Sequence, residues 1–279
     1  MRLTFDQTVC RRIVRSVEAP RGGVGGSHRL TAADRSTTFR IFLIVAITVL
    51  VFAKIYDARG NLTVIYHQRI RDPNTIREYF EAHSIRKLQL GAGENYADGW
   101  LNTDIEPRAN GVYLDATSDY PFPSGSFHYV FAEHLIEHLS WEGGLKMLKE
   151  CHRVLAPGGK IRIVTPNLAK LVYLLNAGPD VEAQRFIEES RRLSGWPDTP
   201  VIRAYIFNKV MREWGHQFIY DSVTLRKTFE LAGFTEITER RIGEKTDLIF
   251  EKVEFRTRAV GEDARFGNSW GAVAFEAVR

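Results

Sequence analysis

The chain has 279 residues, 44% of them hydrophobic, which is enough for one large domain with an appendage or for two small domains. The net charge of +4 is concentrated in residues 1–40, where Arg far outnumbers Asp and Glu, so the rest of the chain is close to neutral. Nucleic-acid-binding proteins usually carry an excess of basic residues on their folded part. Residues 41–279 have no such excess, so we expect no nucleic-acid partner. Two distant cysteines without Cys-x-x-Cys spacing also exclude a disulfide scaffold.

The first part of the chain does not have the composition of a folded domain. Residues 1–38 are rich in Arg, Gly, Ser and Thr, and we interpret them as a disordered basic tail. Residues 39–56 contain an uncharged run, 41–53, which as a helix would span about 20 Å against about 30 Å of bilayer hydrocarbon. We interpret 39–56 as a single hydrophobic helix that associates the chain with a membrane; a signal peptide and a buried core helix are the alternatives. Residues 57–72 would then be a linker.

The composition changes at about residue 73, where we place the start of a folded domain that runs to residue 279. Asp72 and Pro73 are typical N-cap and first-turn residues of a helix. Beyond that helix, the pattern predicts strands at 87–90, 100–105, 111–115, 128–132 and 160–166, helices at 141–155 and 221–233, and a terminal hairpin-like pair from 234–242 and 270–278. This alternation predicts an α/β fold: a Rossmann-like, doubly wound, mostly parallel sheet with an antiparallel terminal strand.

The predicted strand ends carry groups suited to a nucleoside. Ligands of such sheets bind at the carboxyl ends of the strands. The first strand is followed by Gly91-Ala92-Gly93, whose backbone can approach a ligand closely. The second ends in Asp104, able to accept from both hydroxyls of a ribose, and the third in Asp115, able to accept from an exocyclic amine. A third glycine is missing and the segment before Asp104 is short, which disfavours a pyrophosphate-containing cofactor.

Four stretches, in this order, resemble the motifs of class I S-adenosylmethionine-dependent methyltransferases: KLQLGAGENYADGWLNTDIEP, FPSGSFHYVFAEHLIEHL, RVLAPGGKIRIVTPN and GHQFIYDSVTLRKTFELAGF. The resemblance is closest to the type 11 group, in a bacterial branch associated with polysaccharide biosynthesis, and covers about residues 73–279. It implies methyl transfer from S-adenosylmethionine to a small-molecule or saccharide acceptor. By the family pattern, the cofactor would be bound by Gly91, Ala92, Gly93, Asp104, Ile105, Asp115, Ala116, Glu133 and His134. His128 departs from the pattern, which usually has Asp there; that position is mainly structural in the family.

The segment from His134 to His138 has several interpretations. In a metalloprotease, His-x-x-Glu-His would supply two metal ligands and a base, but that hypothesis leaves the strand-end residues unexplained. In a methyltransferase, the same residues could form local hydrogen bonds, take a proton from an acceptor hydroxyl, or hold a divalent cation with His216. We assign no metal ligand and take His138, His216 and Glu137 as the catalytic candidates. Methyl transfer requires no nucleophilic side chain, so the sequence identifies the cofactor better than a catalytic residue.

Residues 177–220 lie outside the alternation and are expected to form a lid insertion on the substrate side. Most aromatic residues there would pack between helices, and we single out Tyr220 and Arg212 as substrate contacts. An inactive, membrane-anchored binding protein with the same fold is the second hypothesis. Because the cofactor is intracellular, we expect a cytoplasmic catalytic domain, with 39–56 crossing the membrane N-out or lying in its interface.

Overall fold

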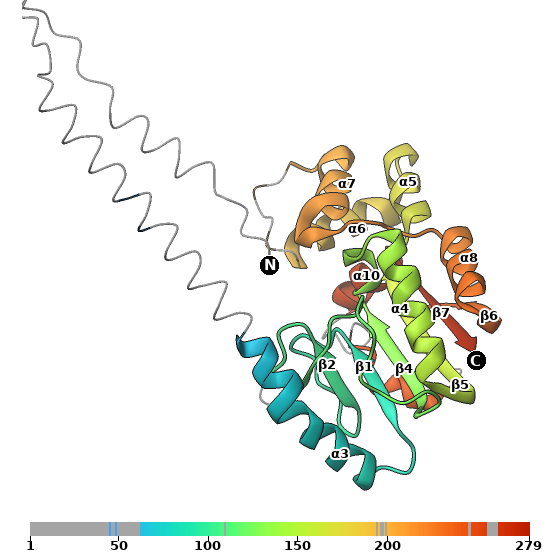
Figure 1. Cartoon of the computed structure of the whole chain (residues 1–279). Helices are drawn as coiled ribbons and strands as arrows, with labels where there is room; N and C mark the ends of the chain where they lie inside the picture. The colour runs from blue at the N-terminus through green and yellow to red at the C-terminus, as the bar shows by residue number, and fades with distance from the viewer. Residues whose placement is uncertain are drawn as a thin grey trace, which may run out of the picture. The chain divides into compact units, whose positions relative to one another are not determined.

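The computed structural model describes residues 62–108, 110–193, 200–244, 247–255 and 262–279, together with Val45, Thr48, Gly195 and Asp198. From residue 62 onward, these residues belong to one compact unit, Asn61–Arg279 (Figure 1). In this described part of the chain, no helix has the length and apolar character needed to cross a membrane. The predicted tail 1–38 and nearly all of the predicted membrane helix 39–56 lie outside the described residues, so both stay predictions.

A seven-stranded sheet forms the centre of this unit, in the order β3-β2-β1-β4-β5-β7-β6 (Figure 1). The pairs among β1 to β5 are parallel, whereas β7 runs antiparallel to both β5 and β6. The strands are β1 Lys87–Leu90, β2 Leu101–Asp104, β3 Val112–Tyr113, β4 Phe127–Glu133, β5 Leu155–Pro166, β6 Thr235–Arg240 and β7 Ala272–Val278. The mostly parallel sheet with an antiparallel terminal strand is therefore confirmed.

Helices and short turns connect these strands. They are η1 His67–Arg71, α3 Asp72–Ala82, η2 Ile136–His138, α4 Trp141–Val154, α5 Leu168–Asn176, α6 Val181–Leu193, α7 Arg203–Arg212, η3 Glu213–Gly215, α8 Ser222–Ala232, α9 Leu248–Glu251 and α10 Glu262–Trp270. Both α4 and α8 lie where the sequence predicts helices. The carboxylate of Asp221 caps α8 by accepting from the N–H of Thr224, and Gly233 ends it with φ 98°, a conformation that favours glycine.

The start of α3 differs from the prediction. Asp72 is not an N-cap, because helical backbone already precedes it over residues 62–71, within the predicted linker 57–72. Its side chain is nearly fully buried. The carboxylate accepts from the backbone N–H of Tyr113 at 2.7 Å and lies 3.1 Å from Nδ1 of His67. Asp72 therefore ties this helix to the edge strand β3.

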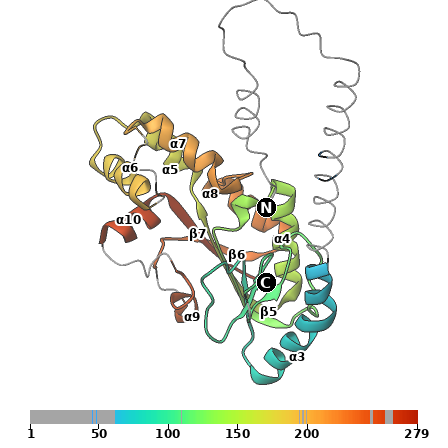
Figure 2. The same cartoon turned by 90° about the vertical axis from the view of Figure 1, so that its left-hand side faces the viewer.

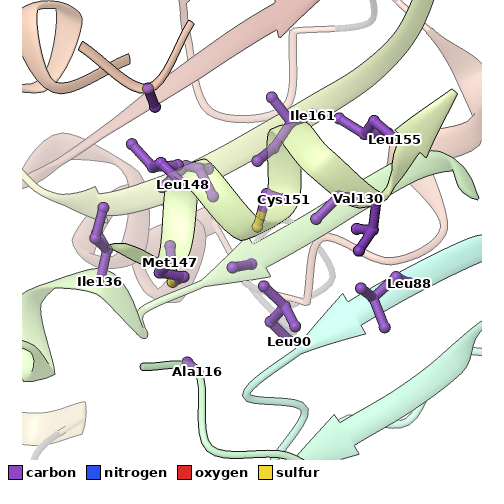
Figure 3. Packing of buried hydrophobic residues seen from close by; sticks show 14 of the residues in the cluster. Leu88, Leu90, Ala116, Val130, Ile136, Met147, Leu148, Cys151, Leu155 and Ile161 are labelled. Carbon is purple, nitrogen blue, oxygen red and sulfur yellow. The ribbon is translucent and has the colours of Figure 1, made fainter. Parts of the chain in front are cut away.

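The two faces of the sheet are covered differently. On one face, α4 and α8 pack on the strands and form the main core; Figure 3 shows Met147, Leu148 and Cys151 of α4 over Val130 of β4 and Leu90 of β1. Full burial of a side chain of this size stabilises the fold by about 1.5–3 kcal/mol. On the other face, where α9 lies (Figure 2), a smaller cluster contains Ala97, Trp100, Phe131, Val164, Phe250, Val253 and Ala274. Residues 91–100, between β1 and β2, contain no helix, so a loop with Ala97 and Trp100 packs on this face in place of a crossover helix.

His128 stands at the start of β4, where the resemblance leads us to expect Asp. Its Nδ1 accepts from the backbone N–H of Arg86 at 3.1 Å, and its own backbone N–H donates to the carbonyl of Arg86 at 2.8 Å. A carboxylate could accept from the same N–H group. The histidine thus connects the start of β4 to Arg86, at the point where the pairing of β4 with β5 shifts register between Phe127 and Tyr129.

Candidate active site

The loop after β1 brings two glycines to the carboxyl end of the sheet. Gly91 (φ 60°) and Gly93 (φ 52°) both have left-handed backbone conformations. A Cβ atom on Gly91 would lie 2.9 Å from the side chain of Leu135, so no larger residue fits without a shift. Ala92 is buried and donates its N–H to the carbonyl of Thr103 at 3.0 Å. The loop backbone is therefore held against the ends of β1 and β2, where the predicted cofactor contact requires it.

Asp104 ends β2 and fixes the same loop. Its Oδ2 accepts from the N–H of Gly93 at 2.8 Å, and its Oδ1 accepts from the N–H of Glu106 at 2.9 Å. An ionised carboxylate has about four acceptor positions, so two are left for the hydroxyls of a ribose. The next residue, Ile105, is 57% exposed and offers apolar surface beside this carboxylate.

Asp115 and Ala116 follow β3. Thr117 donates both its backbone N–H (2.8 Å) and its hydroxyl (2.7 Å) to Oδ1 of Asp115, which fixes the orientation of the carboxylate. Ala116 is buried in the main core. Asp115 also lines a cavity of about 360 Å³, with Tyr113 and Ser118 among its walls. Its other walls come from the η1–α3 helix, β3 and the loop after β3, and neither Asp104 nor the loop from Gly91 to Gly93 lines it, so this cavity is not part of the strand-end site.

Glu133 and His134, at the end of β4, make different contacts. Oε2 of Glu133 accepts from the backbone N–H of Phe255 at 2.8 Å, so this carboxylate connects β4 to the chain after α9. His134 has φ 52°, a rare conformation for a residue with a side chain. Its Nδ1 lies 2.8 Å from Oε1 of Glu137. Of the two predicted cofactor contacts, His134 belongs to the polar cluster described next, whereas the Glu133 carboxylate is engaged in a structural hydrogen bond.

Glu137 is a carboxylate with no exposed surface, in the turn η2. Besides His134 on Oε1, it has the hydroxyl of Thr165 on Oε2 at 3.0 Å. Burial acts to raise the pKa of Glu137, but the neighbouring His134 outweighs burial, and the pKa lies below its ordinary value. Thr165 was missed by the sequence analysis, and its only signal is a hydroxyl near the carboxyl end of an apolar strand.

His138 and His216 come together from distant parts of the chain. Their rings meet edge to face, with centroids 4.8 Å apart. Gln217 joins the two segments, because its backbone N–H donates to the carbonyl of Glu137 (2.8 Å) and its side-chain amide donates to the carbonyl of His138 (2.7 Å). Nδ1 of His216 lies 2.6 Å from the carbonyl of Val210, which places the proton on that nitrogen. The structure thus brings the three predicted catalytic residues into one group, called here the Glu137–His138–His216 cluster.

The two predicted substrate contacts differ in exposure. Tyr220 has no exposed surface; its ring packs on that of Phe218, with centroids 4.8 Å apart, and it belongs to the main core. Burial, followed by the charge of Glu137, raises the pKa of the Tyr220 hydroxyl. Tyr220 is therefore part of the core, and its contact with a substrate stays a prediction. Arg212 ends α7 and is exposed, and its contact with a substrate stays a prediction.

The arrangement gives no support to the metalloprotease hypothesis. In a His-x-x-Glu-His protease both histidines lie on one face of a helix. Here His134 follows a strand in a left-handed conformation, and only Ile136–His138 form a single 3₁₀ turn. Nδ1 of His134 faces Glu137, so the two histidines do not form the metal-binding pair of that motif.

Comparison with known proteins identifies the class. Residues 96–163 match the family described as "Methyltransferase domain", a range that contains Asp104, Asp115 and the segment from Glu133 to His138. No curated protein matches the chain. Over residues 96–163 this chain is therefore similar to a methyltransferase domain. The strand-end site fits S-adenosylmethionine as the cofactor, because Asp104 retains acceptor positions for a ribose and lies against the backbone of Gly93.

Several solved structures are similar to this chain at low sequence identity. One is an S-adenosylmethionine-dependent methyltransferase from Archaeoglobus fulgidus, 18% identical, with a TM-score of 0.40, covering 78% of this chain and 98% of that one. Another is an S-adenosylmethionine-dependent methyltransferase from Mesorhizobium loti, 16% identical, with a TM-score of 0.41, covering 74% and 96%. A third is a phosphoethanolamine N-methyltransferase from Haemonchus contortus with bound S-adenosylhomocysteine, 16% identical, with a TM-score of 0.36, covering 70% and 48%.

Proposed function

We propose that this chain transfers a methyl group from S-adenosylmethionine to a small-molecule or saccharide acceptor at a membrane surface. The observation that carries the proposal is the Glu137–His138–His216 cluster, which joins the end of β4 to the segment that follows α7. Acceptors of this class present hydroxyl or amino groups, and such a group must lose a proton when it is methylated. Imidazoles beside the cofactor site can accept that proton.

The residues of the site have separate tasks. Bound S-adenosylmethionine supplies a methyl group activated by a positively charged sulfur. Asp104 and the loop from Gly91 to Gly93 would hold the nucleoside and methionine parts. An imidazole of His138 or His216 would take the proton from the acceptor atom as that atom attacks the methyl carbon. Alignment and exclusion of water supply much of the rate in such a displacement, and the hydrogen bonds of Thr165 and Gln217 serve the alignment by holding the cluster in place.

The lid segment supports a sugar-like acceptor. Trp214 is 54% exposed and its ring centroid lies 5.7 Å from that of His216. Tyr205 of α7 is 52% exposed, and Arg212 is exposed near the end of the same helix. Exposed aromatic rings beside polar groups suit the apolar face and the hydroxyls of a sugar. Trp196, another aromatic residue of this segment, lies outside the described residues.

The membrane location and the cytoplasmic side are supported by the sequence alone. The uncharged run 41–53 is apolar on all sides, as expected for a segment in contact with lipid. The methyl donor is found inside the cell, so a cytoplasmic catalytic domain is required for activity. A C-terminal reporter fusion that is active only in the cytoplasm is the expected result, and an external reporter signal would contradict this orientation.

The experiment that tests the proposed activity uses the full chain with methyl-labelled S-adenosylmethionine. Soluble sugar derivatives and a membrane extract containing lipid-linked saccharides are offered separately. We expect label in a saccharide product, and a loss of at least 100-fold with His216→Gln. Cofactor binding without transfer to either acceptor class would favour the inactive-binding-protein alternative instead.

A further inference from the structure

We propose that the Glu137–His138–His216 cluster binds a divalent transition-metal ion of the zinc class. The candidate ligand atoms of these three residues all lie within 4.8 Å of one another. Bonds of about 2.1 Å place neighbouring ligands of such an ion roughly 3–4 Å apart, so small side-chain movements close the site. Two imidazoles and one carboxylate are the ligands of zinc and its neighbours in the periodic table, whereas magnesium and calcium favour all-oxygen sites.

The groups around the cluster orient the ligands as in known metal sites. Nδ1 of His216 is held by the carbonyl of Val210 at 2.6 Å, which presents Nε2 as the ligating nitrogen. Glu137 is oriented on Oε1 by His134 and on Oε2 by Thr165, at 2.8 Å and 3.0 Å. Metal-binding histidines usually donate their second nitrogen to a backbone carbonyl or carboxylate, and ligating carboxylates are themselves hydrogen-bonded. The cluster therefore has both its ligands and the second layer of contacts that positions them.

Charge and rigidity also favour a cation. Glu137 has no exposed surface and is paired with His134 on Oε1, and a carboxylate can accept further partners on its remaining positions. Gln217 fixes the segment of His216 to η2 through two hydrogen bonds, of 2.8 Å and 2.7 Å. The ligands from the two segments are thus held together before an ion binds. Such preorganisation lowers the conformational cost of forming the site.

An ion held by three protein ligands keeps a position open for another molecule. An acceptor hydroxyl bound there would be polarised and would lose its proton to water more readily. Its oxygen would then form the bond to the methyl carbon while the carbon–sulfur bond breaks and its electron pair stays on sulfur. With an ion bound, the imidazoles of His138 and His216 would serve as ligands and would not take the proton. The ion would instead make the acceptor hydroxyl more acidic. This role rests on the proposed function, whereas binding of the ion does not.

Calorimetry and cobalt absorption on the full chain test the inference. The protein is freed of metal with a chelator and titrated with Zn²⁺, with Mg²⁺, and with Co²⁺ as a spectroscopic probe. We expect one equivalent of Zn²⁺ to bind at least 100-fold more tightly than Mg²⁺. Bound Co²⁺ should show the visible absorption bands of an ion with a low coordination number. His216→Ala and His138→Ala should each weaken Zn²⁺ binding at least 100-fold. Thr165→Val, which removes only the hydroxyl behind Glu137, should weaken it by about 10-fold.

The control variant is His128→Ala, because His128 lies outside the cluster and should leave Zn²⁺ affinity unchanged. Binding of S-adenosylmethionine, measured on each variant, reports whether the fold is intact. Equal Zn²⁺ affinity in His216→Ala and the unsubstituted chain, or no binding by the unsubstituted chain, would overturn the inference. If Zn²⁺ fails to bind while S-adenosylmethionine still binds, only this inference falls. If S-adenosylmethionine fails to bind, the proposed function falls as well.

Discussion

The hydroxyl of Thr165 donates to Oε2 of Glu137 across 3.0 Å, and this bond links β5 to the turn that follows β4. Glu137 and Thr165 are both fully buried, so the bond forms where water cannot replace it. It is therefore a structural support of the candidate active site.

Thr165→Val should lower the free energy of unfolding by about 1–3 kcal/mol, because a buried carboxylate loses a hydrogen-bond donor while the side-chain shape is kept. Urea unfolding followed by circular dichroism measures the change. Thr103→Val is the matched control: Thr103 is also buried, and its hydroxyl donates to the neutral carbonyl of Gln89 at 2.9 Å. The control should cost less, and a larger loss in Thr103→Val would contradict the importance of the Glu137 bond.

Substitution of His138 by Asn should reduce methyl transfer by roughly 10²–10⁴-fold, the range associated with loss of a proton-accepting group. The affinity for S-adenosylmethionine should change by less than about threefold, a factor worth under 1 kcal/mol. Steady-state rates with the identified acceptor and calorimetry with the cofactor separate the two effects. If the His138→Asn variant kept full activity, the Glu137–His138–His216 cluster would have no part in methyl transfer.

Asp221 should stabilise α8 in a pH-dependent manner. Hydrogen bonds from Thr224 lower the pKa of this carboxyl in the folded chain. Its contribution is therefore complete above the ordinary carboxyl pKa and is lost as the pH falls through the lowered, folded-state pKa. Asp221→Ala should cost about 0.5–2 kcal/mol at neutral pH, whereas Asp221→Asn keeps a capping group and should lose the pH dependence. Unfolding by urea at neutral and acidic pH measures both, and an unchanged pH dependence in Asp221→Asn would refute this role.

Arg162 should be a critical buried charge on β5. It donates to Glu254 and to Glu276, each at 2.8 Å, and is itself 1% exposed. Arg162→Met should destabilise the fold by about 3–5 kcal/mol, because it leaves the buried carboxylate of Glu254 without its cation, whereas Glu276 keeps Arg240 at 3.6 Å. The combined variant Arg162→Met, Glu254→Leu should recover part of that loss. Urea unfolding compares the two, and a double variant less stable than the single one would contradict this explanation.

Local patterns were sufficient to predict most of the sheet. Strand segments such as 87–90 show apolar residues next to turn signals, and Gly233 marks the end of α8 by its own conformational freedom. The strand-end residues Gly91 and Asp104 could be placed because the ends of parallel strands meet at one edge of a sheet. The Gly93–Asp104 hydrogen bond is the direct result of that geometry.

Features that depend on contacts between distant segments could not be predicted. Asp72 has the sequence signature of a helix cap, but it bonds to Tyr113 because the preceding residues are helical too. Tyr220 lies in a polar motif and is nevertheless fully buried, since the chain before α8 enters the core beside Phe218. Thr165 carries no local sign of its bond to Glu137. In each case the contacting residue lies far away in the sequence and is brought close only by tertiary packing. The periodicity of apolar residues carries no information about such contacts.

The measurement that tests the central claim most directly is titration of the full chain with S-adenosylmethionine by calorimetry, with Asp104→Ala as the test variant. Loss of a carboxylate that accepts from the ribose should weaken binding by about 1.5–3 kcal/mol. Asp98→Ala, an exposed acid in the same loop, is the matched control and should leave the affinity unchanged. Binding that Asp104→Ala weakens and Asp98→Ala does not is the predicted result. No binding by the unsubstituted chain, or equal binding by Asp104→Ala, would contradict a cofactor site at these strand ends.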